Sequence, residues 1–381
     1  MSQHAMSRIL PTPPRLATMK PITLLCLLLA RCLVFSGAAS PAIAPGENVR
    51  DFTFILLSDT HVGAENLKAN PPVTREETLS RLRTNLDTMR GWVGRPYPDR
   101  PEFAGLNLGS VAVPRGLIIL GDLTDGHKDP ARQQDQWLTF ETLFPVRGVS
   151  FGDSVVPVFP CAGNHDGELA GPARQGLIGR NRALMQGGRV AALSTNGVHF
   201  ALNWEGVHFV SLGLCPADTT DAETPFKYGK PGPGGWNDPQ GALTFLKDYL
   251  ARHVGASGQP IVLMHHYGFD GFSENDWNWW TVKQRRALYE LLEGYNVVAI
   301  FHGHDHHADH YHWPDPKLHA ADLDCFFEGK PPTNPRQYDI LSCGPVAWLI
   351  RIRDHQLIAA HFKGPGWPTD PGDFFVKGLR P

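Results

Sequence analysis

The segment FHGHDHHADHYHW, residues 301–313, contains six histidines between His302 and His312. Histidine is the commonest metal ligand in proteins and titrates near neutral pH, so a dense run indicates metal binding or proton transfer. The same composition is also typical of polar tracts that bind metals loosely and catalyse nothing. The segment alone is compatible with both interpretations, and donors elsewhere in the chain must distinguish them.

Further nitrogen and oxygen donors occur where apolar runs of the chain end. Asp59 and His61 close the first run in SDTHVG, and His304 and His306 close a later run in GHDH. Each pair is two residues apart, so in an extended segment both side chains point to the same side. The other donors that end such runs are Asp122, Asn164 and His265.

These seven donors exceed the coordination of a single tetrahedral ion and suit two ions that share a carboxylate. No thiolate is among them, which favours a borderline or hard divalent metal such as Mn, Fe or Zn.

The apolar runs themselves predict strands. Several are continuously apolar, as expected for strands buried on both faces. In α/β sheets the carboxyl ends of strands are where ligands collect, because the loops there converge on a crevice. The expected strands are residues 52–59, 116–122, 155–166, 207–214, 260–266, 297–304, 338–344 and 347–353.

Helix signals alternate with these strands and predict an α/β protein with helices outside the sheets. Thr74 and Glu77 form a capping box, Asp129–Pro130 opens a second helix, and Thr281 caps another. A further helix is expected from about Gln240. Two loop-rich insertions, 167–200 and 215–239, follow strands and are expected to overhang the site.

The composition limits the classes of protein to which the chain can belong. The chain has 381 residues, a net charge of −3 and 42% hydrophobic residues, which is typical of a globular chain with one large domain or two smaller ones. A near-neutral balance argues against nucleic acid as the main partner, because binding to phosphate backbones usually needs a basic surplus.

The N-terminus is expected to lie outside the fold. Residues Met19–Ser40 have a lysine, a short apolar run and then small residues, the arrangement of a secretory signal peptide, although an N-terminal membrane anchor is the alternative. We therefore expect residues 1–44 to be signal peptide and disordered N-terminus, and 45–381 to be one secreted or periplasmic domain without a stable membrane span. In such a compartment Cys325 and Cys343 are the favoured disulfide pair.

The ordered motifs DTH, GDLTD, GNHD, MHHYG and GHDH resemble those of the calcineurin-like metallophosphoesterase superfamily. Each motif alone is weak, but five in order over residues 52–306 are specific. The resemblance implies a four-layer α/β/β/α sandwich and a dinuclear metal centre. It implies one metal on Asp59, His61, Asp122 and His306, and a second on Asp122, Asn164, His265 and His304, with Asp122 bridging.

The resemblance also implies catalytic roles. His165 corresponds to the family's non-ligand histidine that faces the phosphate and the leaving group, and Asp125 to the acid that orients it. A tyrosine stands at the position of Asp125 in purple acid phosphatases, and an arginine at that of Gly126 in the protein-phosphatase branch. The chain therefore departs from both, and the arginine's absence argues against a phosphoprotein phosphatase.

Other polar residues near these motifs are expected to have supporting roles. His266 and Asp305 alternate with predicted ligands and are interpreted as supporting or packing groups. Residues Trp277, Trp279 and Trp280 are either an aromatic wall for a bulky leaving group or core packing. The remaining histidines are interpreted as rim or loop residues, with an extra metal ligand among them as the alternative: His302, His307, His310 and His312.

Together these observations predict an exported phosphoesterase. It would hydrolyse a small organic phosphate mono- or diester by attack of a hydroxide that bridges two divalent metals. The alternative is a non-catalytic extracytoplasmic metal-binding protein on the same scaffold.

Overall fold

The computed structural model describes residues 50–69, 71–126, 129–218, 240–269, 280–315, 336–362 and 364–379. Residues Glu47–Pro381 form one compact unit. The predicted signal peptide, the 215–239 insertion beyond residue 218, Trp277, Trp279 and Cys325 lie outside the described residues. Within the described ranges, no helix combines the length and apolar character needed to cross a bilayer.

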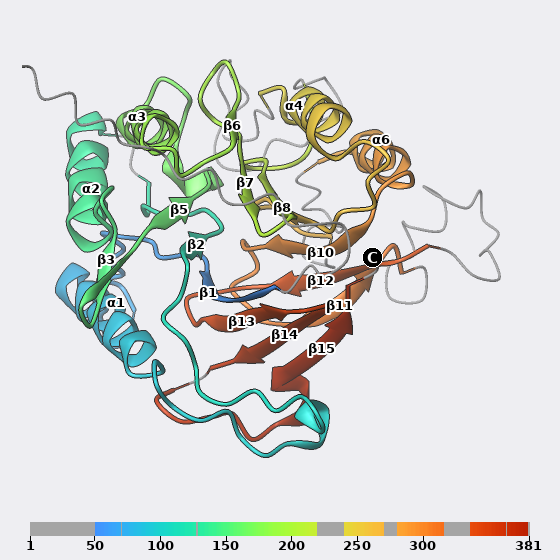
Figure 1. Ribbon diagram of the computed structural model, residues 1–381. Coiled ribbons are helices and arrows are strands. Elements are labelled where there is room, and N and C mark those ends of the chain that lie inside the picture. Colours follow the sequence, from blue (N-terminus) through green and yellow to red (C-terminus); the bar gives the residue numbers. More distant parts are fainter. Residues whose placement is uncertain are drawn as a thin grey trace, which may run out of the picture. The chain divides into compact units, whose positions relative to one another are not determined.

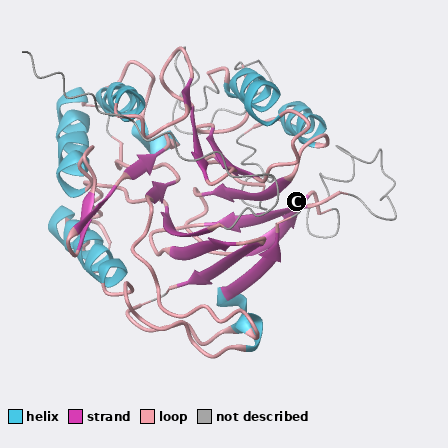
Figure 2. Ribbon diagram, viewed as in Figure 1, coloured by secondary structure: helices cyan, strands magenta, loops and turns pink. Residues whose placement is uncertain are grey.

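Two large mixed sheets organise this unit (Figures 1 and 2). The first has the strand order β15 (Phe374–Gly378), β14 (Gln356–His361), β13 (Trp348–Arg353), β1 (Asp51–Leu57), β2 (Leu117–Ile119) and β5 (Val158–Pro160). The second has the order β11 (His310–Trp313), β12 (Tyr338–Ser342), β10 (Val297–His302), β9 (Ile261–Met264), β8 (Val207–Ser211), β7 (Phe200–Trp204) and β6 (Ala192–Leu193).

Each sheet has a parallel part that supplies loops to the site. Strands β1, β2 and β5 are parallel, as are β12, β10, β9 and β8. The carboxyl ends within each parallel set therefore share one edge of their sheet, where the polar motifs follow. A separate hairpin is formed by β3 (Val149–Phe151) and β4 (Ser154–Val156).

The two sheets pack face to face through aromatic side chains. The ring of Phe54 on β1 meets that of Phe209 on β8 edge-on, with 5.2 Å between centroids, and lies 6.3 Å from that of Phe301 on β10. Such edge-to-face contacts add favourable quadrupole interactions to the burial of apolar area.

Strand β9 is buried on both faces, as its unbroken apolar sequence predicts. Val262 and Met264 belong to the core between the sheets, whereas Ile261 and Leu263 belong to the core under the outer helices. This alternation is the period of two that an extended chain imposes.

The helices form the outer layers (Figure 2). Helices α1 (Arg75–Arg90), α2 (Pro130–Leu143) and α3 (Pro172–Gln186) share the core of the first sheet, and α4 (Ala242–Tyr249) and α6 (Val282–Leu292) share that of the second. The result is an α/β/β/α sandwich, as the sequence predicts. The capping boxes at Thr74 and Thr281 are both formed.

Two of the differences between the sequence predictions and the fold lie in residues 155–200. The 167–200 insertion is not a loop alone, because it contains α3 and β6. Pro172 opens α3 at a position where its missing N–H costs nothing, and Leu177 and Leu184 turn inward at helical spacing. The expected strand 155–166 is also divided, since Pro157 separates β4 from β5.

Candidate metal centre

The loops after β1 and β2 are joined by hydrogen bonds that fix the first motif against the second. Ser58 Oγ donates to the carbonyl of Leu120 at 3.1 Å, and Thr60 Oγ1 donates to that of Leu123 at 2.9 Å. The backbone N–H of His61 donates to the carbonyl of Asp122, also at 2.9 Å. These hydrogen bonds therefore fix the positions of the carboxylates on both loops.

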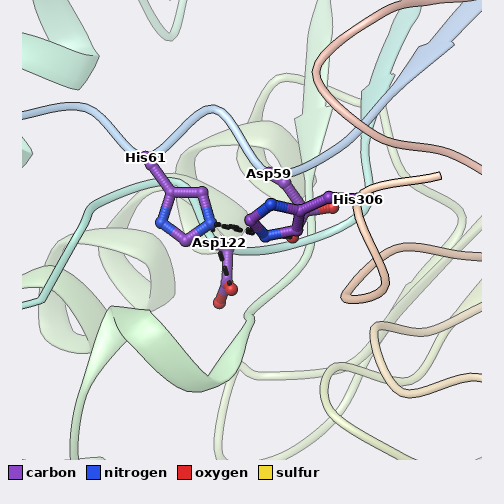
Figure 3. Close-up of side chains that lie close together, drawn as sticks. All are labelled: Asp59, His61, Asp122 and His306. Atoms are coloured by element: carbon purple, nitrogen blue, oxygen red, sulfur yellow. Dashed lines mark hydrogen bonds and ion pairs between the residues drawn. The ribbon is translucent and has the colours of Figure 1, made fainter. Parts of the chain in front are cut away.

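Four side chains from three of the motifs converge (Figure 3). His61 Nε2 lies 3.1 Å from His306 Nε2, 3.6 Å from Asp122 Oδ2 and 3.8 Å from Asp59 Oδ1. His306 Nε2 lies 3.4 Å from Asp59 Oδ1. Zn–N bonds of about 2.1 Å in a tetrahedron separate ligand atoms by roughly 3.4 Å, so these donors are spaced to share a cation.

The electrostatics of this cluster also fit a cation. Asp59 and Asp122 are almost completely buried. Burial favours neutral His61, but the hydrogen bond that it donates to Asp125 and the charges of Asp122, Asp59 and Asp125 outweigh it and raise the pKa of His61 to about 9. The site therefore concentrates negative potential where a divalent ion would neutralise it.

A second group of donors lies on the other side of Asp122. His266 Nε2 is 3.3 Å from Asp122 Oδ1 and 3.1 Å from Asn164 Oδ1, and His304 offers a ring nitrogen to the same group. The two oxygens of Asp122 thus face different clusters, as expected of a bridging carboxylate. His266 Nδ1 donates to the carbonyl of Leu120 at 2.7 Å, which fixes the ring and directs Nε2 at the site.

The structure therefore differs from the sequence prediction at one donor, because His266, and not His265, lies beside Asp122 and Asn164. The ring of His265 packs against Phe269 and Trp280, and burial, with smaller contributions from other histidines, lowers its pKa to about 3. Met264 faces the inter-sheet core, so the next residue points outward and His266 points inward. The strand is apolar on both faces, and for this reason its sequence did not reveal which residues face the site.

The other six predicted donors, Asp59, His61, Asp122, Asn164, His304 and His306, are brought together, although not by an extended backbone. Asp59, His61, Asp122, His304 and His306 all have positive φ, between 40° and 79°. The D-x-H and H-x-H pairs do lie near one another, but the extended backbone assumed for them is wrong. Left-handed conformations of non-glycine residues cost roughly 1–3 kcal/mol each and cluster at functional sites.

Asp166 supports the centre and was missed by the sequence analysis. Its carboxylate is buried and accepts hydrogen bonds from the backbone of Gly163 at 2.7 Å and of Thr124 at 2.9 Å. It therefore binds the GNHD loop to the GDLTD loop. Gly163 permits this approach, because a Cβ there would lie 2.1 Å from the backbone nitrogen of Asp122.

His165 lies beside the first cluster, as the family resemblance implies. Its backbone N–H donates to Asp122 Oδ1 at 2.8 Å, and its Nδ1 donates to the backbone carbonyl of Asp125 at 2.7 Å. The carboxylate of Asp125 lies 3.4 Å from His61 Nδ1. Asp125 thus orients His165 through its main chain, which differs from the expected carboxylate contact, and its side chain faces the ligand His61.

The remaining predicted residues have other roles. His302 is not a rim residue, since it is fully buried and its Nε2 lies 2.7 Å from the hydroxyl of Tyr311. Trp280 is core, because it is buried against Phe269. Asp305 accepts from the backbone of His307. Cys343 is a buried free thiol.

A pocket of about 770 Å³ opens beside the first cluster. Its polar floor includes Asp59, His61, His165 and His306, and its wall is formed largely by α1 and by the loop after β12. The wall residues are Val73, Thr78, Arg81, Leu82, Asn85, Pro345 and Val346. This combination of apolar walls and convergent polar groups is typical of a small-molecule site.

An α/β sandwich with histidine, carboxylate and amide donors at the strand ends defines a hydrolytic enzyme of the dinuclear metal type. A sequence model of the calcineurin-like phosphoesterases matches residues 52–308. The chain belongs to this family, and it is a metal-dependent phosphoric ester hydrolase. The chain matches no curated protein at a significant level.

Solved structures match this chain at low sequence identity. A dimetal phosphatase from Danio rerio is 14% identical with a TM-score of 0.50, covering 87% of this chain and 100% of that chain. GAP50, the anchor in the inner membrane complex of Plasmodium, is 12% identical with a TM-score of 0.43, covering 87% of this chain and 89% of that chain. The first of these supports the fold, and neither specifies a substrate.

Proposed function

We propose that this chain is an exported enzyme that hydrolyses a small organic phosphate ester at its metal centre. The pocket beside His61 and His306 carries the proposal, because it adjoins the ligands and His165 and is large enough for a small ester. Two divalent cations of the Mn, Fe or Zn type would supply Lewis acidity and an activated water when bound.

The chain's own groups would orient the ester and supply a proton. The hydrogen bond from Nδ1 to the carbonyl of Asp125 fixes the His165 ring in the pocket. In its protonated form, Nε2–H of His165 would donate to the departing oxygen. General acid catalysis of this kind contributes roughly 10²–10⁴ in rate.

Arg81 would hold a non-bridging phosphate oxygen from the α1 side of the pocket. It lines the pocket together with His165 and is exposed. An arginine can donate two parallel hydrogen bonds to a phosphate. Gly126 stands where the protein-phosphatase branch has an arginine, and Arg81 would supply a cation from a different element.

The test uses 4-nitrophenyl phosphate and its bis-aryl diester, with the purified chain reconstituted in Mn²⁺, Fe²⁺ or Zn²⁺. We expect hydrolysis of at least one ester and a higher KM for Arg81→Ala. That increase should be larger for the dianionic monoester than for the monoanionic diester. Arg83→Ala is the matched control, since Arg83 is exposed on the same helix and pairs with Glu76. A chain that binds the metals and cleaves neither ester would contradict the proposed small-ester substrate.

Export rests on the sequence of residues Met19–Ser40. The experiment is expression of the full chain in a bacterial host, followed by N-terminal sequencing of the extracytoplasmic protein. A new N-terminus near Ser40 is expected. Retention of Met1 or Met19 on a membrane-bound product would favour the anchor interpretation.

A further inference from the structure

Two histidines of the 301–313 segment take no part in the centre described above. His310 and His312 lie on β11, which pairs antiparallel with β12, and His312 is directly opposite Asp339. Residues two apart on a strand, and residues directly opposite across a pair, share one face of the sheet. The regular register of β11 and β12 therefore gathers two imidazoles and one carboxylate.

These three side chains meet at one oxygen atom. His310 Nε2 lies 2.9 Å from Asp339 Oδ1, and His312 Nε2 lies 3.2 Å from the same oxygen. One ligand atom from each of the three lies within 4.8 Å of those of the other two. The separations resemble those at the main centre, where Asp59 Oδ1 lies 3.4 Å from His306 Nε2.

The facing sheet holds this cluster in place. Lys377 on β15 pairs with Asp339 Oδ2, which leaves Oδ1 directed at the histidines. The Phe375 ring lies 4.0 Å from that of His310 between centroids. The Lys377 pair and the two histidine contacts thus orient the carboxylate, as the surroundings of a metal ligand must.

We propose that His310, His312 and Asp339 form a separate binding site for one zinc ion at the edge between the two sheets. Two imidazoles and a carboxylate are a known zinc donor set, and three protein ligands leave a position for water. His312 is half-exposed, so the ion has access from solvent. The site is independent of the proposed phosphoesterase activity.

The experiment counts zinc on the full chain by equilibrium dialysis and elemental analysis. We expect His310→Gln/His312→Gln to bind one zinc fewer than wild type, and His312→Gln alone to bind that zinc more weakly. The control is His307→Gln, an exposed histidine of the same segment, which should keep the wild-type count. In an Asp122→Asn background, the same one-equivalent difference should persist.

A second readout is thermal unfolding with and without zinc. Zinc bound at this site should raise the midpoint in Asp122→Asn protein and no longer do so after the double substitution. An equal zinc count in wild type and double variant would overturn the proposal. A lower midpoint with an unchanged count would also overturn it, because the three residues would then form hydrogen bonds only.

Discussion

The candidate metal centre and the cluster of His310, His312 and Asp339 differ in the backbone conformation that builds them. The candidate metal centre uses loops after strands, where five of its donors adopt positive φ and most are buried. The cluster of His310, His312 and Asp339 uses the register of two paired strands and is partly exposed. The first arrangement is strained and held by surrounding hydrogen bonds, whereas the second needs only regular pairing. Backbone strain of this kind clusters at functional sites, because it persists only where the surrounding structure offsets its free-energy cost.

The largest expected effect comes from Asp122→Asn, which replaces the carboxylate that faces both groups of donors. We expect hydrolysis of 4-nitrophenyl phosphate to fall by about 10⁴-fold, since loss of the metals removes several kcal/mol of transition-state stabilisation. The measurement is kcat/KM with metal content per chain. Asp153→Asn, at an exposed position in the β3–β4 turn, is the control. Near-wild-type activity of Asp122→Asn would remove the basis for a bridging role.

A smaller loss of activity should distinguish His266 from its neighbour His265. His266→Ala should lower kcat/KM by about 10³-fold and reduce the metal content, because its Nε2 lies against Asp122 and Asn164. His265→Phe should keep the wild-type kcat/KM and metal content, since the ring of His265 packs among aromatic side chains. The opposite result for the pair would restore His265 as the ligand.

His165→Gln should keep both metals and lower kcat by about 10²-fold. The loss should be larger for an alkyl phosphate than for 4-nitrophenyl phosphate, because a poor leaving group depends more on protonation. Elemental analysis measures the metal content, and kcat for the two substrates measures the dependence on the leaving group. Equal losses on both substrates would contradict a role in proton donation.

The smallest expected effect is on the free energy of unfolding and concerns the cluster of His310, His312 and Asp339. It is measured by urea unfolding in the presence of EDTA. The folded pKa of Asp339 is about 2, below the ordinary carboxyl value of about 3.9, so its stabilisation is present above about pH 4 and lost as pH falls toward 2. Asp339→Asn should therefore cost about 1 kcal/mol at pH 7, a value reduced for partial exposure, and less at pH 3. A difference that grows as pH falls would contradict this assignment.

Much of the fold was predictable because its signals are local. Each of the eight expected apolar runs contains a strand, and the caps at Thr74, Asp129 and Thr281 start helices where expected. Helix α3 was missed among glycines and arginines. Edge strands such as β11 and β15 were also missed, since short, mixed sequences carry weak periodicity.

The sequence by itself determined the family and the α/β class, and it predicted six of the donors that the structure brings together, because motif residues and apolar runs are properties of neighbouring positions. Only the tertiary structure decided between His265 and His266, since a strand buried on both faces gives no sign of which face meets the site. It also decided that Asp125 orients His165 by its carbonyl, and that His312 lies opposite Asp339. These contacts join residues 27 to 40 positions apart, and strand pairing and loop packing bring them together.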